Sequence, residues 1–274
     1  MNEKIIKDFK AYLIEMEASK NTRDTYLYAV NNHRKKYGDI TKSNVILEKQ
    51  YRINNKFKPA GINAYLSAMN KFLEFKNGNK LETVRQLKIQ TKHFRENIIS
   101  QQDYQRLLEV SLSYNNNKLY YFIIKTLANT GVRISELLKF MREDVLNGSV
   151  EVLSKGSKYR HIFFPKSFKA EIVEWIKESG IKSGVLFFNK FNKPLTTRGV
   201  GYILKKIADK ADVDKTKVYP HSFRHFFAKQ FLKRSKDISV LSDLLGHDSF
   251  STTQIYMRRT QNEQQNIVNR TVDW

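Results

Sequence analysis

The chain has 274 residues, of which 41% are hydrophobic, so it can build a core and is not a disordered chain. It contains no cysteine, which excludes disulfides, thiol chemistry and cysteine-ligated zinc. No apolar run reaches the ~18 residues of a membrane-spanning helix, so no membrane partner is expected. The N-terminus MNEKIIKDFKAYLIEME is interrupted by charges where a signal peptide would be apolar, which favours a cytoplasmic protein.

The net charge of +22 is the most informative bulk property of the chain. Lysine and arginine total 49 against 27 acidic residues, and residues 1–95 carry 20 basic and 9 acidic residues, half of the excess. A net charge of about 2–8 is sufficient for the solubility of a small domain. The larger excess predicts a polyanionic partner, and nucleic acid is the obvious one. The alternative is a lysine-rich soluble protein whose composition reflects an AT-rich genome.

The first ninety residues show the periodicity of helices. Apolar residues near the N-terminus recur at three- and four-residue steps, which predicts one helix with an apolar stripe. Thr22 is placed to cap a second helix, which stops at Gly38. A third helix is expected over residues 43–53. A fourth is expected to begin at residue 61 or 62 and to end at about residue 76. The first stripe consists of Ile5, Ile6, Phe9, Tyr12, Leu13 and Met16.

A polar, basic stretch without a clear period follows and is interpreted as a linker over residues 91–99. Ser100 and Asp103 then give a capping signal for the next helix. Apolar runs at helical spacing over residues 118–129 and 133–141 predict two helices more.

The pattern changes at residues 150–164, VEVLSKGSKYRHIFF, which alternate around Lys155 and Gly156 and predict a β-hairpin. A helix over residues 167–178 and a short strand at 185–188 follow. Helices return over residues 197–211, 222–233, 238–245 and 250–259.

The predicted fold class is therefore mainly α with a small antiparallel β-sheet, in two domains. A helical domain covers residues 1–90, the linker covers 91–99, and a larger, mostly helical domain with the inserted sheet covers 100–274.

Five motifs in the larger domain carry residues suited to chemistry. They are TGVRISELL with Arg133, SKGSK with Lys155, HSFRH with His221, Arg224 and His225, LGH with His247, and STTQIYMRR with Tyr256. A metal site is one alternative, because the three histidines are possible ligands. However, a metalloprotease helix would carry a glutamate between its histidines, and here an arginine lies there instead. A fixed guanidinium would oppose a divalent cation, so no metal is expected.

A purely structural interpretation is the second alternative. Arg133 is three residues from Glu136 and can form an ion pair with it on a helix. A single histidine in an apolar helix is usually a satisfied core residue, and a tyrosine near a C-terminus usually packs. Taken together, two arginines, a lysine, histidines and one tyrosine without paired carboxylates favour chemistry.

That set of residues suits the transfer of a phosphodiester without a metal. Negative charge gathers on the non-bridging oxygens in the transition state, and two guanidinium forks can bind them in fixed geometry. Such donors are typically worth about 2.7–4 kcal/mol each. A lysine at a hairpin tip can protonate the leaving alkoxide. Nearby positive charge helps a tyrosine, with its reference pKa near 10, to ionise. A tyrosyl phosphate ester keeps the energy of the bond, so the strand can be rejoined without ATP or another cofactor.

The chain resembles the tyrosine recombinases, the family of phage integrases and Xer proteins, over nearly its whole length. The resemblance implies a helical core-binding domain, a linker and a catalytic domain. It implies that Arg133 and Arg224 grip the scissile phosphate, and that His221 and His247 assist by hydrogen bonding and proton handling. It also makes Lys155 the general acid. The implied nucleophile is Tyr256, nine residues after the LGH motif.

Several assignments stay open. Lys158 and Arg160 are basic alternatives to Lys155, and Tyr219 and Tyr202 are the nearest rivals of Tyr256 as nucleophile.

Three neighbouring residues receive supporting roles. Phe223 stands where the family usually has leucine, at a position that should be buried. His225 is interpreted as structural, and Glu136 as orienting the turn of the active site.

The resemblance also implies double-stranded DNA as partner, bound by both domains as a clamp, and a 3′-phosphotyrosyl intermediate. It implies a homotetramer during synapsis, from a monomer or dimer off DNA. The tail, residues 266–274, could dock on a neighbouring protomer or on its own domain. Two other functions compete: a type IB topoisomerase, which relaxes DNA alone, and a non-catalytic DNA-binding regulator. The short N-terminal domain argues against the first and the intact residue set against the second.

Overall fold

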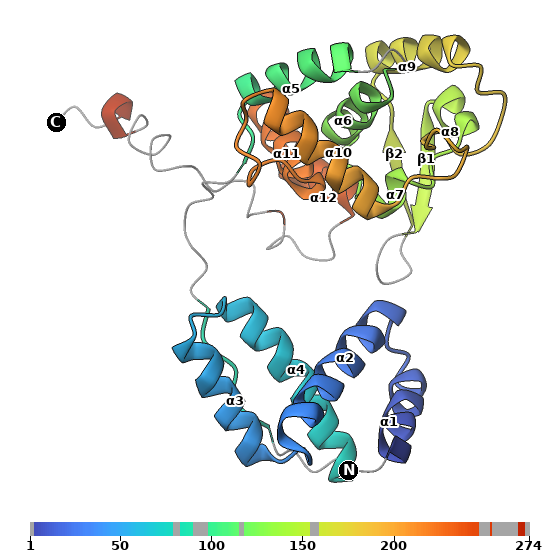
Figure 1. Cartoon of the computed structure of the whole chain (residues 1–274). Coiled ribbons are helices and arrows are strands. Elements are labelled where there is room, and N and C mark those ends of the chain that lie inside the picture. Colours follow the sequence, from blue (N-terminus) through green and yellow to red (C-terminus); the bar gives the residue numbers. More distant parts are fainter. Residues whose placement is uncertain are drawn as a thin grey trace. The chain divides into compact units, whose positions relative to one another are not determined.

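The computed structural model of the chain describes residues 3–78, 83–89, 98–114, 118–153, 159–246, 253 and 268–271. The chain divides into two compact units, Met1–Thr91 and Lys92–Trp274, each with its own hydrophobic core (Figure 1). Most of the segment predicted as a linker lies outside the described residues. The predicted boundaries of 1–90, 91–99 and 100–274 therefore stay a prediction.

The first unit is helical throughout its described elements. They are α1 (Glu3–Glu15), α2 (Lys20–Tyr37), α3 (Lys42–Asn54) and α4 (Pro59–Lys76). The long helix α4 packs against α1, α2 and α3. Its buried face includes Leu66 and Phe72, and Phe72 meets Phe9 of α1 edge to face with ring centroids 5.0 Å apart. The apolar stripe predicted near the N-terminus thus lies on this core, with Phe9 and Leu13 at its centre. The inclusion of Met16 was wrong, because it follows the end of α1 and is 52% exposed.

The start of α2 differs from its predicted position. Ser19 is the N-cap, and its side chain accepts a hydrogen bond from the backbone N–H of Thr22 at 3.2 Å. The prediction that Thr22 caps this helix was wrong, since Thr22 already lies inside the first turn. The serine three residues earlier has the spacing that satisfies a free N–H group at a helix start.

Buried polar groups also join the helices of the first unit. His33 of α2 lies 2.9 Å through Nε2 from Oδ1 of Asn44 and 2.6 Å through Nδ1 from the hydroxyl of Tyr65. The amide oxygen can only accept, so Nε2 carries the proton and Nδ1 accepts from the tyrosine. Burial lowers the pKa of His33, which is consistent with a neutral ring. Nearby, the buried carboxylate of Glu48 accepts from Lys36, Tyr37 and Arg52.

The second unit begins with α5, whose N-terminus forms the predicted capping box. Ser100 N–H donates to Asp103 Oδ2 at 2.9 Å, and Asp103 N–H donates to Ser100 Oγ at 3.0 Å. The described elements of this unit follow in the order α5 (Gln101–Tyr114), α6 (Leu119–Thr130), α7 (Ile134–Leu137), α8 (Arg142–Asn147), β1 (Ser149–Leu153), β2 (Tyr159–Phe163), α9 (Lys166–Glu178), α10 (Thr197–Lys210), α11 (Pro220–Ser235) and α12 (Ile238–Leu245).

Helix α6 is the centre of this unit, because it packs against both α5 and α11. Phe122, Ile123, Ile124 and Leu127 are buried on it. The helix ends at Gly131, which adopts a left-handed conformation with φ of +61°. Glycine favours this conformation because it has no Cβ. The chain then turns sharply and reaches α7.

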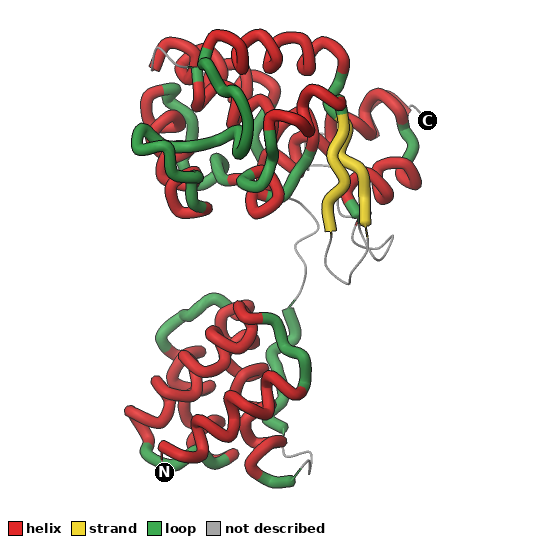
Figure 2. The backbone as a smooth tube through the Cα atoms, turned by 90° about the vertical axis from the view of Figure 1, so that its right-hand side faces the viewer, coloured by secondary structure: helices red, strands yellow, loops and turns green. Residues whose placement is uncertain are grey.

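The two strands form an antiparallel hairpin, as predicted (Figure 2). The register pairs Ser149 with Phe163 and Leu153 with Tyr159. Along β2, Arg160 and Ile162 are buried, while Tyr159, His161 and Phe163 are exposed. The hairpin therefore presents an arginine toward the core of the unit. Its connecting residues, 154–158, lie outside the described residues.

Two predicted elements were wrong, and one cause explains both. Residues 133–141 do not form one helix: α7 ends at Leu137, and α8 begins at Arg142. Residues 138 and 139 form a turn, and the chain after it pairs with a distant segment, since Leu186 N–H donates to Phe140 O at 2.8 Å and Arg142 N–H donates to Gly184 O at 3.0 Å. The residues predicted as a strand, 185–188, form only isolated bridges to residues 141 and 194.

The predicted fold class is confirmed: the chain is mainly helical with a small antiparallel sheet. The helix predicted over residues 250–259 lies outside the described residues apart from Thr253, and so does most of the tail. Within the described part of the chain, no helix is both long enough and apolar enough to cross a membrane.

Candidate active site

Arg133 is the N-cap residue of α7, directly after the turn at Gly131. Its backbone N–H donates to Glu136 Oε2 at 2.8 Å, and its Nη1 donates to Glu136 Oε1 at 3.1 Å. Glu136 thus closes the turn from both sides, as its predicted orienting role requires. The ion pair considered as a structural alternative for Arg133 exists. About a third of the side chain of Arg133 is nevertheless exposed, so its guanidinium can also meet a ligand.

Arg224 comes from the first turns of α11 and is almost wholly buried, with 1% of its surface exposed. Its Nη1 donates to the carbonyl of Gly131 at 2.9 Å, and its Nη2 donates to the carbonyl of Leu245. The preceding residue, Phe223, is fully buried, as expected for its position. A buried charge of this kind needs several hydrogen bonds to be tolerated, and the two carbonyls provide them.

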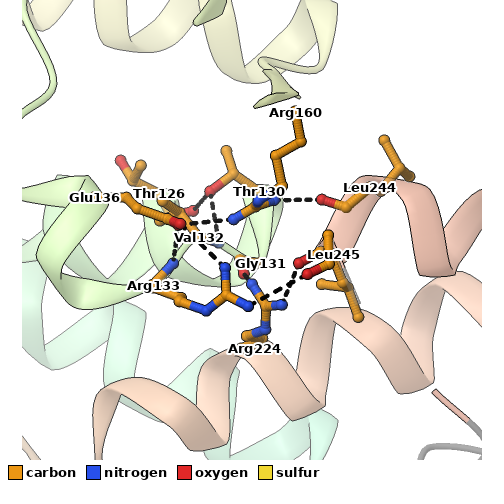
Figure 3. A network of polar contacts seen from close by, with 11 residues as sticks. Thr126, Thr130, Gly131, Val132, Arg133, Glu136, Arg160, Arg224, Leu244 and Leu245 are labelled. Atoms are coloured by element: carbon orange, nitrogen blue, oxygen red, sulfur yellow. Dashed lines mark hydrogen bonds and ion pairs between the residues drawn. The ribbon is translucent and has the colours of Figure 1, made fainter. Parts of the chain in front are cut away.

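Arg133 and Arg224 both donate hydrogen bonds to the C-terminal end of α12. Arg224 reaches the carbonyl of Leu245, and Arg133 Nη2 approaches the adjacent carbonyl of Gly246 at 3.5 Å. The last carbonyls of a helix have no partner within it and carry the negative end of the helix dipole, so they attract cations. Two guanidiniums that are far apart in the sequence are therefore held side by side (Figure 3).

Arg160 of β2 reaches the same helix end from the hairpin. Its Nη1 donates to the carbonyl of Leu244, and its Nη2 donates to Glu136 Oε2 at 2.7 Å (Figure 3). We refer to Arg133, Arg160, Arg224 and Glu136 as the arginine cluster. Burial lowers the pKa of the Arg160 guanidinium, Glu136 opposes this shift, and the like charge of Arg133 adds to it. Arginine nevertheless stays protonated near neutral pH.

The arginine cluster has a net positive charge, because it contains three guanidiniums and one carboxylate, which Arg133 and Arg160 bind. Each of the three guanidiniums also donates to at least one backbone carbonyl, which carries no net charge. Such a cluster is suited to an anion with several oxygens in fixed positions, and a phosphodiester is one.

The histidines of the HSFRH motif lie on the same stretch of α11 as Arg224. His221 is exposed and His225 is buried, and their rings meet edge to face with centroids 4.5 Å apart. The burial of His225 agrees with the structural role suggested for it. His247, the third ligand of the metal alternative, lies outside the described residues, so the absence of a metal stays a prediction.

A comparison with known proteins identifies the family. The model of the phage integrase family matches residues 97–263, which is more than half of the chain. The chain belongs to the phage integrase family. It is a tyrosine recombinase, as its motifs suggested.

Individual relatives agree with this family. Tyrosine recombinase XerC of Lactobacillus delbrueckii subsp. bulgaricus is 37% identical over 136 residues, a match that spans 46% of this chain and 46% of the relative. Tyrosine recombinase XerA of Thermococcus kodakarensis is 28% identical over 263 residues, covering 93% of this chain and 91% of the relative. The structure of the Tn1549 transposon integrase in complex with transposon right end DNA has a TM-score of 0.72 at 16% identity, covering 97% of this chain and 99% of that one. This last likeness shows the fold.

Three of the six residues assigned from the family motifs lie outside the described residues: Lys155, His247 and Tyr256. The structure brings Arg133 and Arg224 together at α12, with His221 on the helix that carries Arg224. The three undescribed residues stay predictions, as does Lys158. Arg160 does not fit the general acid, because a guanidinium keeps its proton near neutral pH and this one is already bound to Glu136 and Leu244.

The two rival tyrosines are described. Tyr219 is the N-cap residue of α11, and Tyr202 is 67% exposed on α10, where the ammonium of Lys206 lies 5.9 Å from its ring centroid. No hydrogen bond recorded among the described residues links either hydroxyl to the arginine cluster. Tyr256 therefore stays the predicted nucleophile.

The anchoring of the site on α12 was missed by sequence reasoning. Every residue carries a carbonyl, so no residue type marks the helix end as the point where arginines meet. The burial of Arg160, in contrast, could have been predicted from the sequence. Arg160 and Ile162 share one phase of the alternation in YRHIF, so the arginine faces the same side of the hairpin as a core residue.

Proposed function

We propose that this chain cuts and rejoins duplex DNA at specific sites through a 3′-phosphotyrosyl intermediate, with Arg133 and Arg224 binding the scissile phosphate. One observation carries the proposal. Two arginines from different elements, α7 and α11, donate to adjacent carbonyls at the end of α12. Their guanidiniums therefore form one prearranged site for anionic oxygens. The chain runs from this helix end directly into the segment with His247 and Tyr256.

In the cleavage step, the phenolic oxygen of Tyr256 attacks the phosphorus and the bond to the 5′ oxygen breaks. The phenol gives up its proton to a nearby base, and Lys155 protonates the leaving 5′ oxygen. Negative charge that builds up on the non-bridging oxygens is stabilised by the two guanidiniums, whose geometry is set before the substrate arrives. His221 and His247 donate hydrogen bonds to the same phosphate and help to transfer protons.

In the rejoining step, a 5′-hydroxyl from a partner duplex attacks the phosphotyrosyl bond and releases Tyr256 with its proton restored. One phosphodiester replaces another, so no ATP is consumed. All the positive charge that the mechanism requires comes from side chains, and no metal or cofactor takes part. Removing one such fixed donor typically lowers the rate by about 10²–10³.

The proposed partner is double-stranded DNA, contacted through phosphates by basic residues of both units. The net charge of +22 supports this partner. The Tn1549 integrase was solved in complex with DNA, and a lambda integrase was solved as a dimer bound to a core site. We propose that four protomers act together in strand exchange, that the protein is a monomer or dimer off DNA, and that it works in the cytoplasm.

A nicked suicide substrate tests the proposal directly. The short fragment beyond the cleavage site diffuses away, so the phosphotyrosyl intermediate accumulates and survives denaturation. We expect the unaltered chain to form this complex and Tyr256→Phe to lose it while binding DNA equally well. Tyr202→Phe is the matched control, because it removes an exposed hydroxyl on α10 and should not affect trapping. DNA binding without a covalent product would instead support the non-catalytic regulator.

A further inference from the structure

Arg160 has no role in the proposed chemistry, yet it is among the least exposed charged residues of the described chain. Only 6% of its surface is exposed, although it lies on a two-stranded hairpin. Burying a guanidinium is costly unless every contact is well placed. The place of Arg160 in the fold therefore calls for an explanation in terms of what it touches.

We propose that Arg160 is a positioning residue that shares the carboxylate of Glu136 with Arg133, and so leaves the charge of Arg133 available to the scissile phosphate. The inference rests on the proposed function, since it concerns how Arg133 is prepared for that phosphate. It adds Arg160 to the groups that determine the electrostatics of the site.

The contacts of Glu136 are the first argument. Its Oε1 accepts from Arg133 Nη1 at 3.1 Å, and its Oε2 accepts from the Arg133 backbone N–H at 2.8 Å and from Arg160 Nη2 at 2.7 Å. The shortest of these contacts belongs to Arg160. A carboxylate held in this way divides its negative charge between two guanidiniums. If Arg160 were absent, Arg133 would be the only guanidinium among the described contacts of Glu136, and its charge would be largely neutralised.

The second argument is the contact that the other terminal nitrogen of the Arg160 guanidinium, Nη1, makes with α12. Arg160 Nη1 donates to the carbonyl of Leu244, which directly precedes the carbonyl that Arg224 binds and lies two residues before the one that Arg133 approaches. The three arginines thus donate to three successive carbonyls at the end of α12, of which Figure 3 labels Leu244 and Leu245. Arg160 joins β2, α7 and α12 through one planar group, which lysine cannot reproduce.

A charge-balancing role differs from a merely structural one in a measurable way. If Arg160 only filled space, removing a second cluster residue would add to the damage. If Arg160 offsets the charge of Glu136, then removing that charge as well should restore part of the activity. Arg160→Met and the double variant Arg160→Met with Glu136→Gln both lack the bond to Leu244, so their comparison isolates the charge of residue 136.

The experiment measures the first-order rate of covalent complex formation on the nicked substrate, together with DNA affinity and the unfolding midpoint. We expect R160M to bind DNA as the unaltered chain does and to cleave about 10²-fold more slowly, as a misplaced catalytic group does. The double variant should cleave at least about tenfold faster than R160M, which recovers one of the two powers of ten that R160M loses in rate. Arg160→Lys should fall between R160M and the unaltered chain.

A matched control is available at Arg106, whose guanidinium also binds one carboxylate and one backbone carbonyl. Arg106 lies on α5 and donates to Asp103 Oδ1 at 2.9 Å and to Asp212 O at 3.3 Å. It is not part of the arginine cluster. Arg106→Met should leave the cleavage rate unchanged.

Two results would overturn the inference: R160M cleaving at the rate of the unaltered chain, or the double variant being no faster than R160M. If R160M lacks a native circular dichroism spectrum, Arg160→Gln replaces it in the same comparison, with the same deciding outcomes. Failure of the proposed function is recognised separately, because the unaltered chain would then form no covalent complex at all.

Discussion

Gly131 offers a sharp test of how the site is built, because it is crowded and also adopts a left-handed conformation. A Cβ added at this position would lie 2.5 Å from Cδ1 and 3.0 Å from Cγ of Phe227, and 3.1 Å from Cδ2 of Leu245. Both ring atoms are close, so the whole ring of Phe227 must move. The carbonyl of Gly131 also accepts from Arg224 at 2.9 Å, so the movement would reach the arginine cluster.

The expected cost of Gly131→Ala has two parts. A left-handed conformation costs a residue with a Cβ about 1–2 kcal/mol. Overpacking against a well-packed neighbour adds about 1–3 kcal/mol, which brings the total to about 2–5 kcal/mol. Gly180→Ala is the matched control, because Gly180 has a φ of +66° and no atom within 4 Å of an added Cβ. That substitution should cost only the first part, about 1–2 kcal/mol.

Tryptophan fluorescence during denaturant unfolding measures this difference, because both tryptophans of the chain, Trp175 and Trp274, belong to the second unit. We expect Gly131→Ala to lower the free energy of unfolding by about 1–3 kcal/mol more than Gly180→Ala. We also expect it to slow formation of the covalent complex. Equal losses of stability for the two variants would refute the close packing of Phe227 against Gly131.

Four further outcomes are expected. Leu66→Ala should destabilise the first unit by about 2–5 kcal/mol, since Leu66 is fully buried, and circular dichroism should record this loss while tryptophan fluorescence does not. Burial by itself would raise the pKa of Glu48, but hydrogen bonds from its three partners outweigh this effect and the pKa is lowered. The stability that Glu48 contributes is therefore present above its ordinary pKa of 4.5 and lost as the pH falls through its lowered value in the folded state, so unfolding experiments on Glu48→Gln should show a weaker dependence on acid pH. Arg224→Lys keeps the positive charge but loses the planar guanidinium that can donate two parallel hydrogen bonds. The covalent complex should therefore form about 10²–10³ times more slowly, with little change in DNA affinity. DNA affinity should fall by at least about 10³ between roughly 50 and 200 mM salt in a filter-binding titration; a flat response would contradict extensive phosphate contact.

Much of the fold could be predicted from the sequence where an element has a clear apolar face. Helices α9, α10 and α12 begin and end within one residue of their predicted bounds, because each has a regular stripe of buried residues. The hairpin was predicted for a similar reason, since β2 alternates between buried and exposed residues and β1 between half-buried and exposed ones over residues 150–153. In these elements local periodicity and tertiary burial agree.

Predictions failed where a distant segment determined the local structure. Residues 140 and 141 follow the helical pattern, but they leave the helix because this part of the chain forms backbone hydrogen bonds with residues 184–186. The partner is more than forty positions away, and no local pattern indicates it. The same limit applies to the site. The sequence indicated that Arg133 and Arg224 act on one phosphate, whereas the carbonyls at the end of α12 that hold them together carry no sequence signal.

The central claim is that a prearranged pair of guanidiniums holds a phosphate while a phenol displaces one DNA strand. Mass spectrometry of the trypsin-digested covalent complex tests it most directly, because it identifies the amino acid attached to the DNA. We expect a nucleotide on Tyr256, in amounts that Arg133→Ala and Arg224→Ala each reduce by at least about 10². A nucleotide on any other residue, or trapping that is insensitive to both arginines, would contradict the claim.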